Sequence, residues 1–129
     1  MSTLKVATIQ DTSGNNSSTP AGIASGTAKA WVNFNGTGTV AIRDDFNVSS
    51  VTDQNTGRYT VNLTNAMGTA ENYCVSGSTG AGAGGDVTPF DSGGAVYVAP
   101  TSTAFRVRIA NTNGAHTDQR HVMIVVHGA

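Results

Sequence analysis

The sequence predicts an all-β protein: an antiparallel β-sandwich or jelly-roll-like domain of about eight strands, preceded by an extended N-terminal arm. Three observations support this prediction. Apolar and polar residues alternate with a period of two in several short runs. Gly, Asn and Asp residues that favour turns separate these runs. Gly accounts for 16 of the 129 residues and only 12% are charged, and no stretch shows the pattern of a long amphipathic helix.

Residues 1–26 differ in composition from the rest of the chain. The run LKVATIQ at 4–10 is strand-like, and a polar segment rich in Gly, Ser and Asn follows it. Leu4, Val6 and Ile9 are too few apolar residues to build a core of their own. We therefore expect residues 1–26 to form an arm and linker, with these three side chains as candidate attachment residues that another surface must cover.

The remaining residues, 27–129, are expected to form a single β-sandwich domain, since a chain of this length holds one domain. Its first strand ends at the turn Asn35-Gly36. Ala30, Val32 and Phe34 alternate with polar neighbours and are expected to face the core. Trp31, the only tryptophan of the chain, is expected on the opposite face.

The later strands are recognised by the same alternation and by the turns between them. In the strands expected at 58–65 and 105–111, the odd-numbered apolar residues are expected to face inward. The last strand, at 120–128, is apolar on both faces, which is typical of a central or covered strand. The expected connections are a bend at Asp44-Asp45, turns at 53–57 and 111–119, and a Gly-rich loop at 77–86. The expected strands cover 39–45, 46–52, 58–65 (Tyr59, Val61 and Leu63 inward), 72–78, 94–100, 105–111 (Phe105, Val107 and Ile109 inward) and 120–128.

The segment from Gly80 to Gly85, GAGAGG, formally matches the G-x-G-x-x-G pattern of dinucleotide-binding proteins. That pattern requires a helix to begin at the glycines, so that its N-terminus meets the pyrophosphate. Here DVTPF follows, with Pro89 and no helical pattern. We interpret the segment as a loop and expect no cofactor.

Histidines and the single cysteine were the other candidates for chemistry. His121 and His127 lie six residues apart on one expected strand, roughly 20 Å at the usual rise per residue, so one metal ion cannot join them. His116 could approach His121 only through the turn region. Cys74 is expected to be an inert, partly buried thiol, because the sequence shows no base beside it. We therefore expect no metal site, no catalytic residues and no enzymatic activity.

Trp31 has two interpretations. A large apolar side chain on the outer face of a sheet is commonly covered by a neighbouring subunit or a loop. Alternatively, an exposed indole can serve as a stacking platform for a sugar or a partner. Trp31 is therefore a candidate for an interface residue or a ligand-stacking residue, and the sequence leaves both open.

Charge and targeting features restrict the partners. The formal net charge is −1 and the seven basic residues form no run, so we expect no nucleic-acid partner. No apolar run approaches the roughly 20 residues that span a bilayer, and we expect no membrane insertion. Residues 1–10 lack the apolar segment of a signal peptide, which favours synthesis in the cytoplasm without secretion.

Three segments carry a resemblance to a known family. LKVATIQDTSGNNSSTP at 4–20 is followed by AKAWVNFNGTGTVAIRDDFNVSSV at 28–51 and GRYTVNLTNAM at 57–67. Over residues 3–67 they resemble the tail-fibre-like virion structural proteins of tailed bacteriophages. The resemblance implies a non-enzymatic virion component that acts as a homotrimer. It also implies an N-terminal segment attached to the particle and a β-rich domain that projects outward.

The expected function is therefore that of a fibre or spike-like component of a bacteriophage virion, made in the host cytoplasm, which exposes a β-domain for host attachment or surface binding. Its expected partners are copies of itself and other virion proteins contacted through the arm, with a host surface glycan as a further candidate. A capsid decoration protein, that is, a head-fibre or cement protein, is the first alternative. A carbohydrate-binding module is the more remote one.

Overall fold

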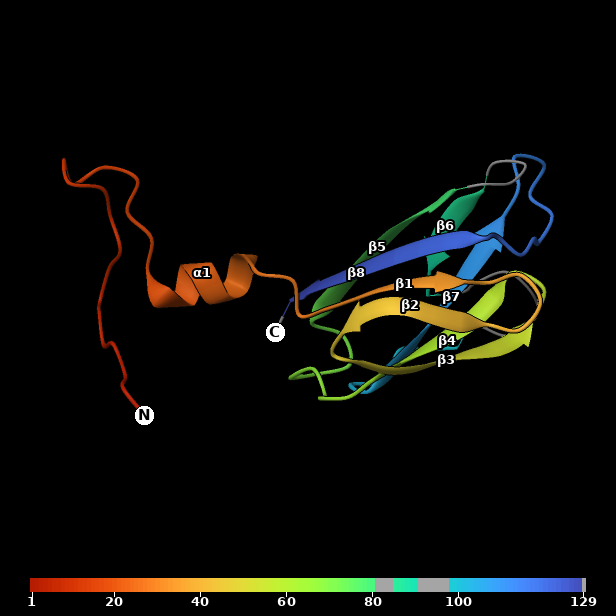
Figure 1. The fold of residues 1–129 in the computed structure, drawn as a ribbon, viewed down its shortest axis with the longest axis horizontal. Coiled ribbons are helices and arrows are strands. Elements are labelled where there is room, and N and C mark those ends of the chain that lie inside the picture. Colours follow the sequence, from red (N-terminus) through yellow and green to blue (C-terminus); the bar gives the residue numbers. More distant parts are fainter. Residues whose placement is uncertain (81–84, 91–97, 129) are drawn as a thin grey trace.

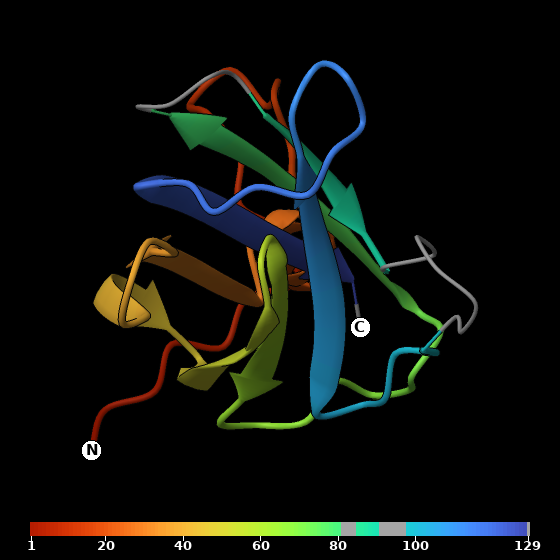
Figure 2. The ribbon, with the colours of Figure 1, turned by 90° about the vertical axis from the view of Figure 1, so that its right-hand side faces the viewer.

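A computed structural model describes residues 1–80, 85–90 and 98–128 of the chain. Within these ranges, eight strands form two four-stranded antiparallel sheets that pack as a β-sandwich (Figures 1 and 2). The first sheet has the order β2 (Ala41–Phe46), β1 (Ala30–Asn35), β8 (His121–Gly128) and β5 (Tyr73–Gly80). The second has the order β3 (Val48–Asn55), β4 (Arg58–Leu63), β7 (Ala104–Ala110) and β6 (Asp86–Pro89). The predicted all-β sandwich of eight strands is confirmed.

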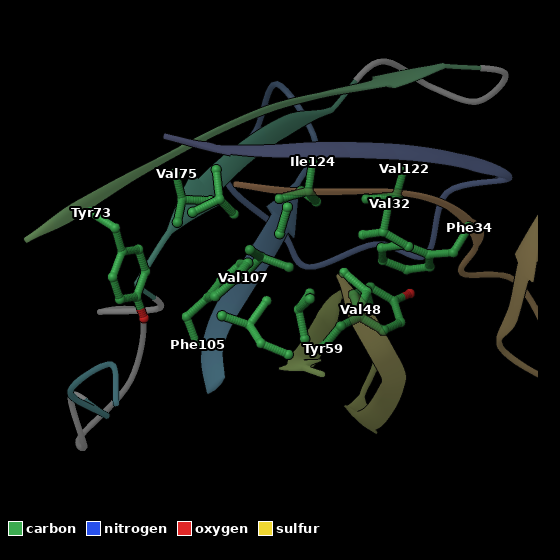
Figure 3. Close-up of a cluster of buried hydrophobic side chains, with 14 of the residues drawn as sticks. Val32, Phe34, Val48, Tyr59, Tyr73, Val75, Phe105, Val107, Val122 and Ile124 are labelled. Carbon is green, nitrogen blue, oxygen red and sulfur yellow. The ribbon is translucent and has the colours of Figure 1, made fainter. Parts of the chain in front are cut away.

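The core lies between the two sheets and follows the predicted alternation. Side chains from β1 and β8 of the first sheet face those from β4 and β7 of the second (Figure 3). The rings of Phe34 and Tyr59 meet edge to face, with their centroids 5.1 Å apart. The inward rows expected from the sequence are all buried: Ala30, Val32, Phe34, Tyr59, Val61, Leu63, Phe105, Val107 and Ile109.

Strand β8 occupies a central position in the first sheet, between β1 and β5. This placement explains its unusual sequence, which is apolar on both faces. Val122, Ile124 and Val126 are buried in the core, while Met123 and Val125 lie on the outer face of the sheet. The predicted central strand is therefore confirmed.

The bend expected at Asp44-Asp45 is wrong. Both aspartates lie inside β2, and the chain crosses to the second sheet at Asn47, whose φ is 59°. The side-chain amide of Asn47 donates to the carbonyl of Lys29, at 3.0 Å, and its oxygen accepts from the backbone N–H of Asn65, at 2.7 Å. An asparagine tolerates this left-handed conformation and bonds to neighbouring backbone, so it forms the corner between β2 and β3.

Three other sequence expectations differ from the structure. The Gly-rich loop expected at 77–86 is shorter, because β5 extends to Gly80 and β6 begins at Asp86. Strand β6 was not expected; its Pro89 is accommodated because β6 is an edge strand. The strand expected at 94–100 lies outside the described residues at 94–97, and residues 98–100 are not in a strand.

The N-terminal region contains an element that the sequence analysis did not predict. Residues Pro20–Gly26 form a short helix, α1. The Thr19 side chain caps it by accepting from the N–H of Gly22, at 3.0 Å, and Pro20 occupies its first turn. None of the helices among the described residues is long and apolar enough to cross a membrane.

Candidate functional site

The candidate attachment residues Leu4, Val6 and Ile9 lie on a segment that folds back on itself. The predicted strand over 4–10 does not form; a single antiparallel bridge instead joins Ile9 to Ser18 by two backbone hydrogen bonds of 2.8 and 2.7 Å. Asp11 closes the turn between them, because its carboxylate accepts from the N–H groups of residues 13 and 15 and from the Asn16 side chain. This doubled-back turn brings residues 4–9 alongside α1.

Residues 4–9 and α1 border an open apolar hollow of about 590 Å³. We call its exposed apolar side chains Leu4, Val6, Ile9 and Ile23 the arm cluster. Leu4 is 85% exposed and Ile9 52%, and every residue from 1 to 27 is exposed. The full lining is Leu4, Lys5, Val6, Ile9, Pro20, Ile23, Ala24 and Thr27. Contiguous exposed apolar groups of this kind are typical of sites that another molecule covers.

The structure adds Ile23 to the three residues that the sequence singled out. Ile23 was not predicted, because residues 11–26 were interpreted as a polar linker. One pattern could have found it: Thr19 followed by Pro20 is a typical N-cap and first-turn pair of a helix. Recognising α1 would have placed Ile23 on a helix next to the apolar run 4–9.

Trp31 lies where the alternation placed it, on the outer face of the first sheet, and it is half-buried. The strand register places Phe46 on one side of it and Val125 on the other. Phe46 is 54% exposed, and Met123 occupies the next outward position of β8. We call Trp31, Phe46, Met123 and Val125 the outer stripe. Trp31 is absent from the lining of the arm hollow, so the two candidate sites are separate.

Polar groups and a shallow hollow accompany the outer stripe. Asn33 and Asp44 are paired beside it in the register, and Arg43 donates to the Asn33 carbonyl at 3.3 Å. Arg43 is the extra residue of a β-bulge in β2, which turns its side chain toward this face. The hollow, of about 290 Å³, lies over β5 and β8 and is lined by Ser76, Gly77, Ser78, Met123, Ile124 and Val125.

A partly buried polar cluster holds three connecting segments together at one end of the sandwich. The Tyr59 hydroxyl lies 2.7 Å from the Asp118 carboxylate and 2.9 Å from the Gly36 carbonyl. Asp118 also accepts from the N–H of Gly57, at 2.7 Å. Burial raises the pKa of Tyr59 well above its ordinary value. The hydrogen bond to Asp118 and the negative charge of Asp118 raise this pKa further. A neutral phenol that serves as a donor here suits a structural role.

Cys74 is exposed, so the expected partly buried thiol is wrong. Its neighbours Tyr73 and Val75 face the core, and β5 is an edge strand whose outer face is open. The register also places His127 directly opposite Cys74, a juxtaposition that the sequence did not reveal. Between these two residues, both within the described part of the chain, no hydrogen bond forms.

The other candidates for chemistry are dispersed. His121 and His127 lie at opposite ends of β8, and His116 pairs with Ala110 in an isolated bridge. Among residues 1–80, 85–90 and 98–128, no group of three metal-ligating side chains gathers. Of the GAGAGG segment, residues 81–84 lie outside the described ranges, and β6 begins at Asp86 where the dinucleotide pattern would need a helix.

Comparison with known proteins gives no match to this chain among protein-family models, curated proteins or solved structures.

Proposed function

We propose that this chain is a structural component of a tailed-bacteriophage virion, a fibre or spike-like protein that its N-terminal arm attaches to the particle. The observation that carries the proposal is the exposed arm cluster, Leu4, Val6, Ile9 and Ile23. The N-terminal segment that carries it lies apart from the two sheets (Figure 1). A short segment with apolar side chains in water gains free energy when a partner covers them. The arm therefore supplies the anchor, and the sandwich is displayed.

The sandwich has the properties of a displayed domain. Its core is closed by its own two sheets and uses no side chain from the arm. Copies of the chain associate as a homotrimer in this proposal, with the outer stripe as the surface that the copies share. Several copies on one particle then turn weak contacts with a host surface into strong attachment.

Attachment to particles tests the proposal. Full-length protein mixed with phage particles that lack it should sediment with them. A variant with Leu4→Ser, Val6→Ser and Ile9→Ser should remain in the supernatant while its sandwich stays folded. Leu4→Val, Val6→Ile and Ile9→Val together make the matched control, because this variant changes the same three positions and keeps their apolar character. Equal sedimentation of the arm variant and the wild type would refute the anchor role.

A capsid decoration protein is the second form of the same proposal, since an exposed apolar arm would also tie neighbouring capsid subunits together. Antibodies raised against the sandwich and visualised by electron microscopy separate the two forms. Labelling of the tail supports a fibre or spike, and labelling distributed over the head supports decoration.

A carbohydrate-binding module is the remaining candidate, and the outer stripe favours it. Trp31 and Phe46 are neighbours on an open sheet face with Asn33 and Asp44 beside them. Aromatic rings next to hydrogen-bonding groups suit a sugar ring. A glycan array probed with the wild type and with Trp31→Ala decides the matter: binding that Trp31→Ala abolishes supports the module, and an array without binding excludes it.

A further inference from the structure

The outer face of the second sheet gathers three of the five arginines of the chain. Tyr59 and Val107 are buried in the core, so their neighbours Arg58, Arg106 and Arg108 project to the opposite face of β4 and β7. All three are half-buried. A chain with a formal net charge of −1 thus carries a local concentration of positive charge on one face. We call these three residues the arginine face.

The strand register sets two of these charges against each other. Arg58 pairs directly with Arg108, and Arg106 lies two residues before Arg108 on β7. Like charges at directly opposed positions destabilise a sheet. The same pairing places Arg106 opposite Thr60 on this face.

Arg106 and Arg108 have no carboxylate partner in the described part of the chain. Within the described residues, no carboxylate lies within ion-pairing distance of either guanidinium; the partner of Arg106 is the neutral Gln54 carbonyl, at 3.4 Å. The Nε of Arg108 is buried and has no hydrogen-bond partner. Asp86, on the edge strand β6, is exposed and pairs with Ala110 rather than with an arginine. Arg106 and Arg108 are only half-buried, so the exposed part of each guanidinium group is open to an external acceptor.

A small hollow adjoins Arg106. It measures about 170 Å³, and its lining includes Thr60, Val98, Ala99, Thr101, Ala104 and Arg106. Segment 98–101 forms one wall, and the outer face of β4 and β7 forms the floor. The hollow thus places two threonine hydroxyls and an apolar wall beside a guanidinium group.

We propose that the arginine face and its hollow bind an acidic polysaccharide through its oxyanion groups. Guanidinium groups bind carboxylate, sulfate and phosphate through paired hydrogen bonds, and partial burial strengthens such contacts. Thr60, Asn62 and Thr88 on the same face can bond sugar hydroxyls. The register places no aromatic side chain on the outer face of β3, β4, β6 or β7, so this face lacks the stacking platforms of single-stranded nucleic-acid sites.

Titration of the full-length chain with defined polymers tests this site. Polygalacturonate presents carboxylates, dextran sulfate presents sulfates, inorganic phosphate presents the bare anion, and neutral dextran is the uncharged reference. We expect calorimetry to detect binding of at least one acidic polymer and none of neutral dextran. Which acidic polymer binds more tightly identifies the oxyanion. Failure of both acidic polymers to bind would overturn the proposal, as would binding of DNA in their absence.

Matched variants separate a specific site from net charge. The double variant Arg106→Gln with Arg108→Gln should lose affinity for the acidic polymer at least tenfold. The control double variant, Arg43→Gln with Arg120→Gln, removes the same amount of charge from two exposed arginines, one in β2 and one just before β8. The affinity of this control for the acidic polymer should stay within about twofold of the wild type. An equal loss in both double variants would show that net charge alone governs binding and would refute the site.

Thermal unfolding gives a second measurement that does not depend on calorimetric signal. A ligand that binds the folded state raises the melting temperature. The acidic polymer should raise the melting temperature of the wild type and leave the melting temperature of the Arg106→Gln, Arg108→Gln variant unchanged. An equal rise in both proteins refutes the site. These measurements use the isolated protein, so their outcome is independent of the proposed attachment to a particle, which the sedimentation assay reads separately.

Discussion

At the scale of single residues, the sandwich depends on a few polar groups whose hydrogen bonds require exact positions. Tyr59 is fully buried, yet its hydroxyl reaches the Asp118 carboxylate and the Gly36 carbonyl. Gly57 presents its N–H to the same carboxylate. These contacts join the turns after β1 and β3 to the segment before β8, so they fix one end of the fold.

Replacing Tyr59 with Phe should lower the free energy of unfolding by about 1–3 kcal/mol at neutral pH, because a hydrogen bond to the half-buried Asp118 carboxylate is lost. The pKa of Tyr59 is raised in the folded state, whereas the unfolded residue ionises near pH 10. Its contribution is therefore present below pH 10 and decreases as the pH rises above that value. Urea unfolding between pH 8 and pH 11 measures this change.

The stability difference between wild type and Tyr59→Phe should shrink by up to about 1.4 kcal/mol per pH unit above pH 10. Tyr73→Phe is the control, because it removes a hydroxyl that bonds the carbonyl of Thr101 and leaves the contact between Tyr59 and Asp118 intact. The Tyr73→Phe variant should keep the loss of stability above pH 10 that Tyr59 contributes. If the difference in unfolding free energy between wild type and Tyr59→Phe stays constant up to pH 11, this result would contradict the structural role of the neutral phenol.

Gly57 and Gly38 form a matched pair. Both adopt left-handed backbone, with φ of 66° and 65°. A Cβ at Gly57 would lie 2.5 Å from the carbonyl oxygen of Ile109, whereas a Cβ at Gly38 would meet nothing within 4 Å. Gly38→Ala should therefore cost about 1–2 kcal/mol for the backbone alone. Gly57→Ala should cost clearly more or prevent folding, and equal urea midpoints for the two variants would count against the crowding.

At the scale of elements, the corner between β2 and β3 shows how one side chain connects the two sheets. Asn47 bonds the backbone of Lys29 before β1 and of Asn65 after β4. The two sheets share few backbone hydrogen bonds, and the Asn47 side chain holds them together at this edge of the sandwich. The other edge is closed by contact between β5 and β6.

Substitutions at Asn47 separate its two contributions. Asn47→Ala should lower the free energy of unfolding by about 2–4 kcal/mol, because it removes the side-chain hydrogen bonds and disfavours the left-handed backbone. Asn47→Gly restores the backbone freedom and should recover about 1 kcal/mol of that loss. Chemical unfolding of both variants measures these values. If Asn47→Ala unfolds at the wild-type denaturant concentration, the corner is not fixed by this residue.

Elements with clean alternation were predictable from the sequence, and those that depend on tertiary contacts were not. The inward rows of β1, β4 and β7 and the central position of β8 followed from residue type alone. Strand β6 was missed because its four residues, with a terminal proline, are too few to show a period and rely on pairing with β7. The position of Asp44 and Asp45 inside β2 was missed because turn propensity was given more weight than pairing with β1.

The candidate sites were predictable to different degrees. Leu4, Val6 and Ile9 were identified from composition, but Ile23 required the helix α1 to bring it to the same hollow. The outward position of Trp31 followed from alternation, whereas its neighbours Phe46 and Val125 followed only from the strand register. The same is true of the arginine face, because Arg58 is about 50 residues away from Arg108 in sequence and faces it only through pairing of β4 with β7.

At the scale of the whole molecule, the chain consists of an exposed N-terminal segment with its own apolar cluster and a sandwich with a closed core (Figure 1). The outer faces of the two sheets differ: the first carries the outer stripe around Trp31, and the second carries the arginine face. In our proposal the arm attaches, the outer stripe joins copies of the chain, and the arginine face meets the ligand. The arm and the arginine face each have their own variant, so these two roles can be tested separately.

Cryo-electron microscopy of the phage particle tests the central claim most directly, because it shows which part of the chain meets the rest of the virion. Our proposal predicts density for residues 4–9 and Pro20–Gly26 against another virion protein, with the sandwich projecting from the particle. Particles assembled with the Leu4→Ser, Val6→Ser, Ile9→Ser variant should lack the projecting density. A sandwich packed against the particle with its arm uncontacted, or particles without this chain, would contradict the proposal.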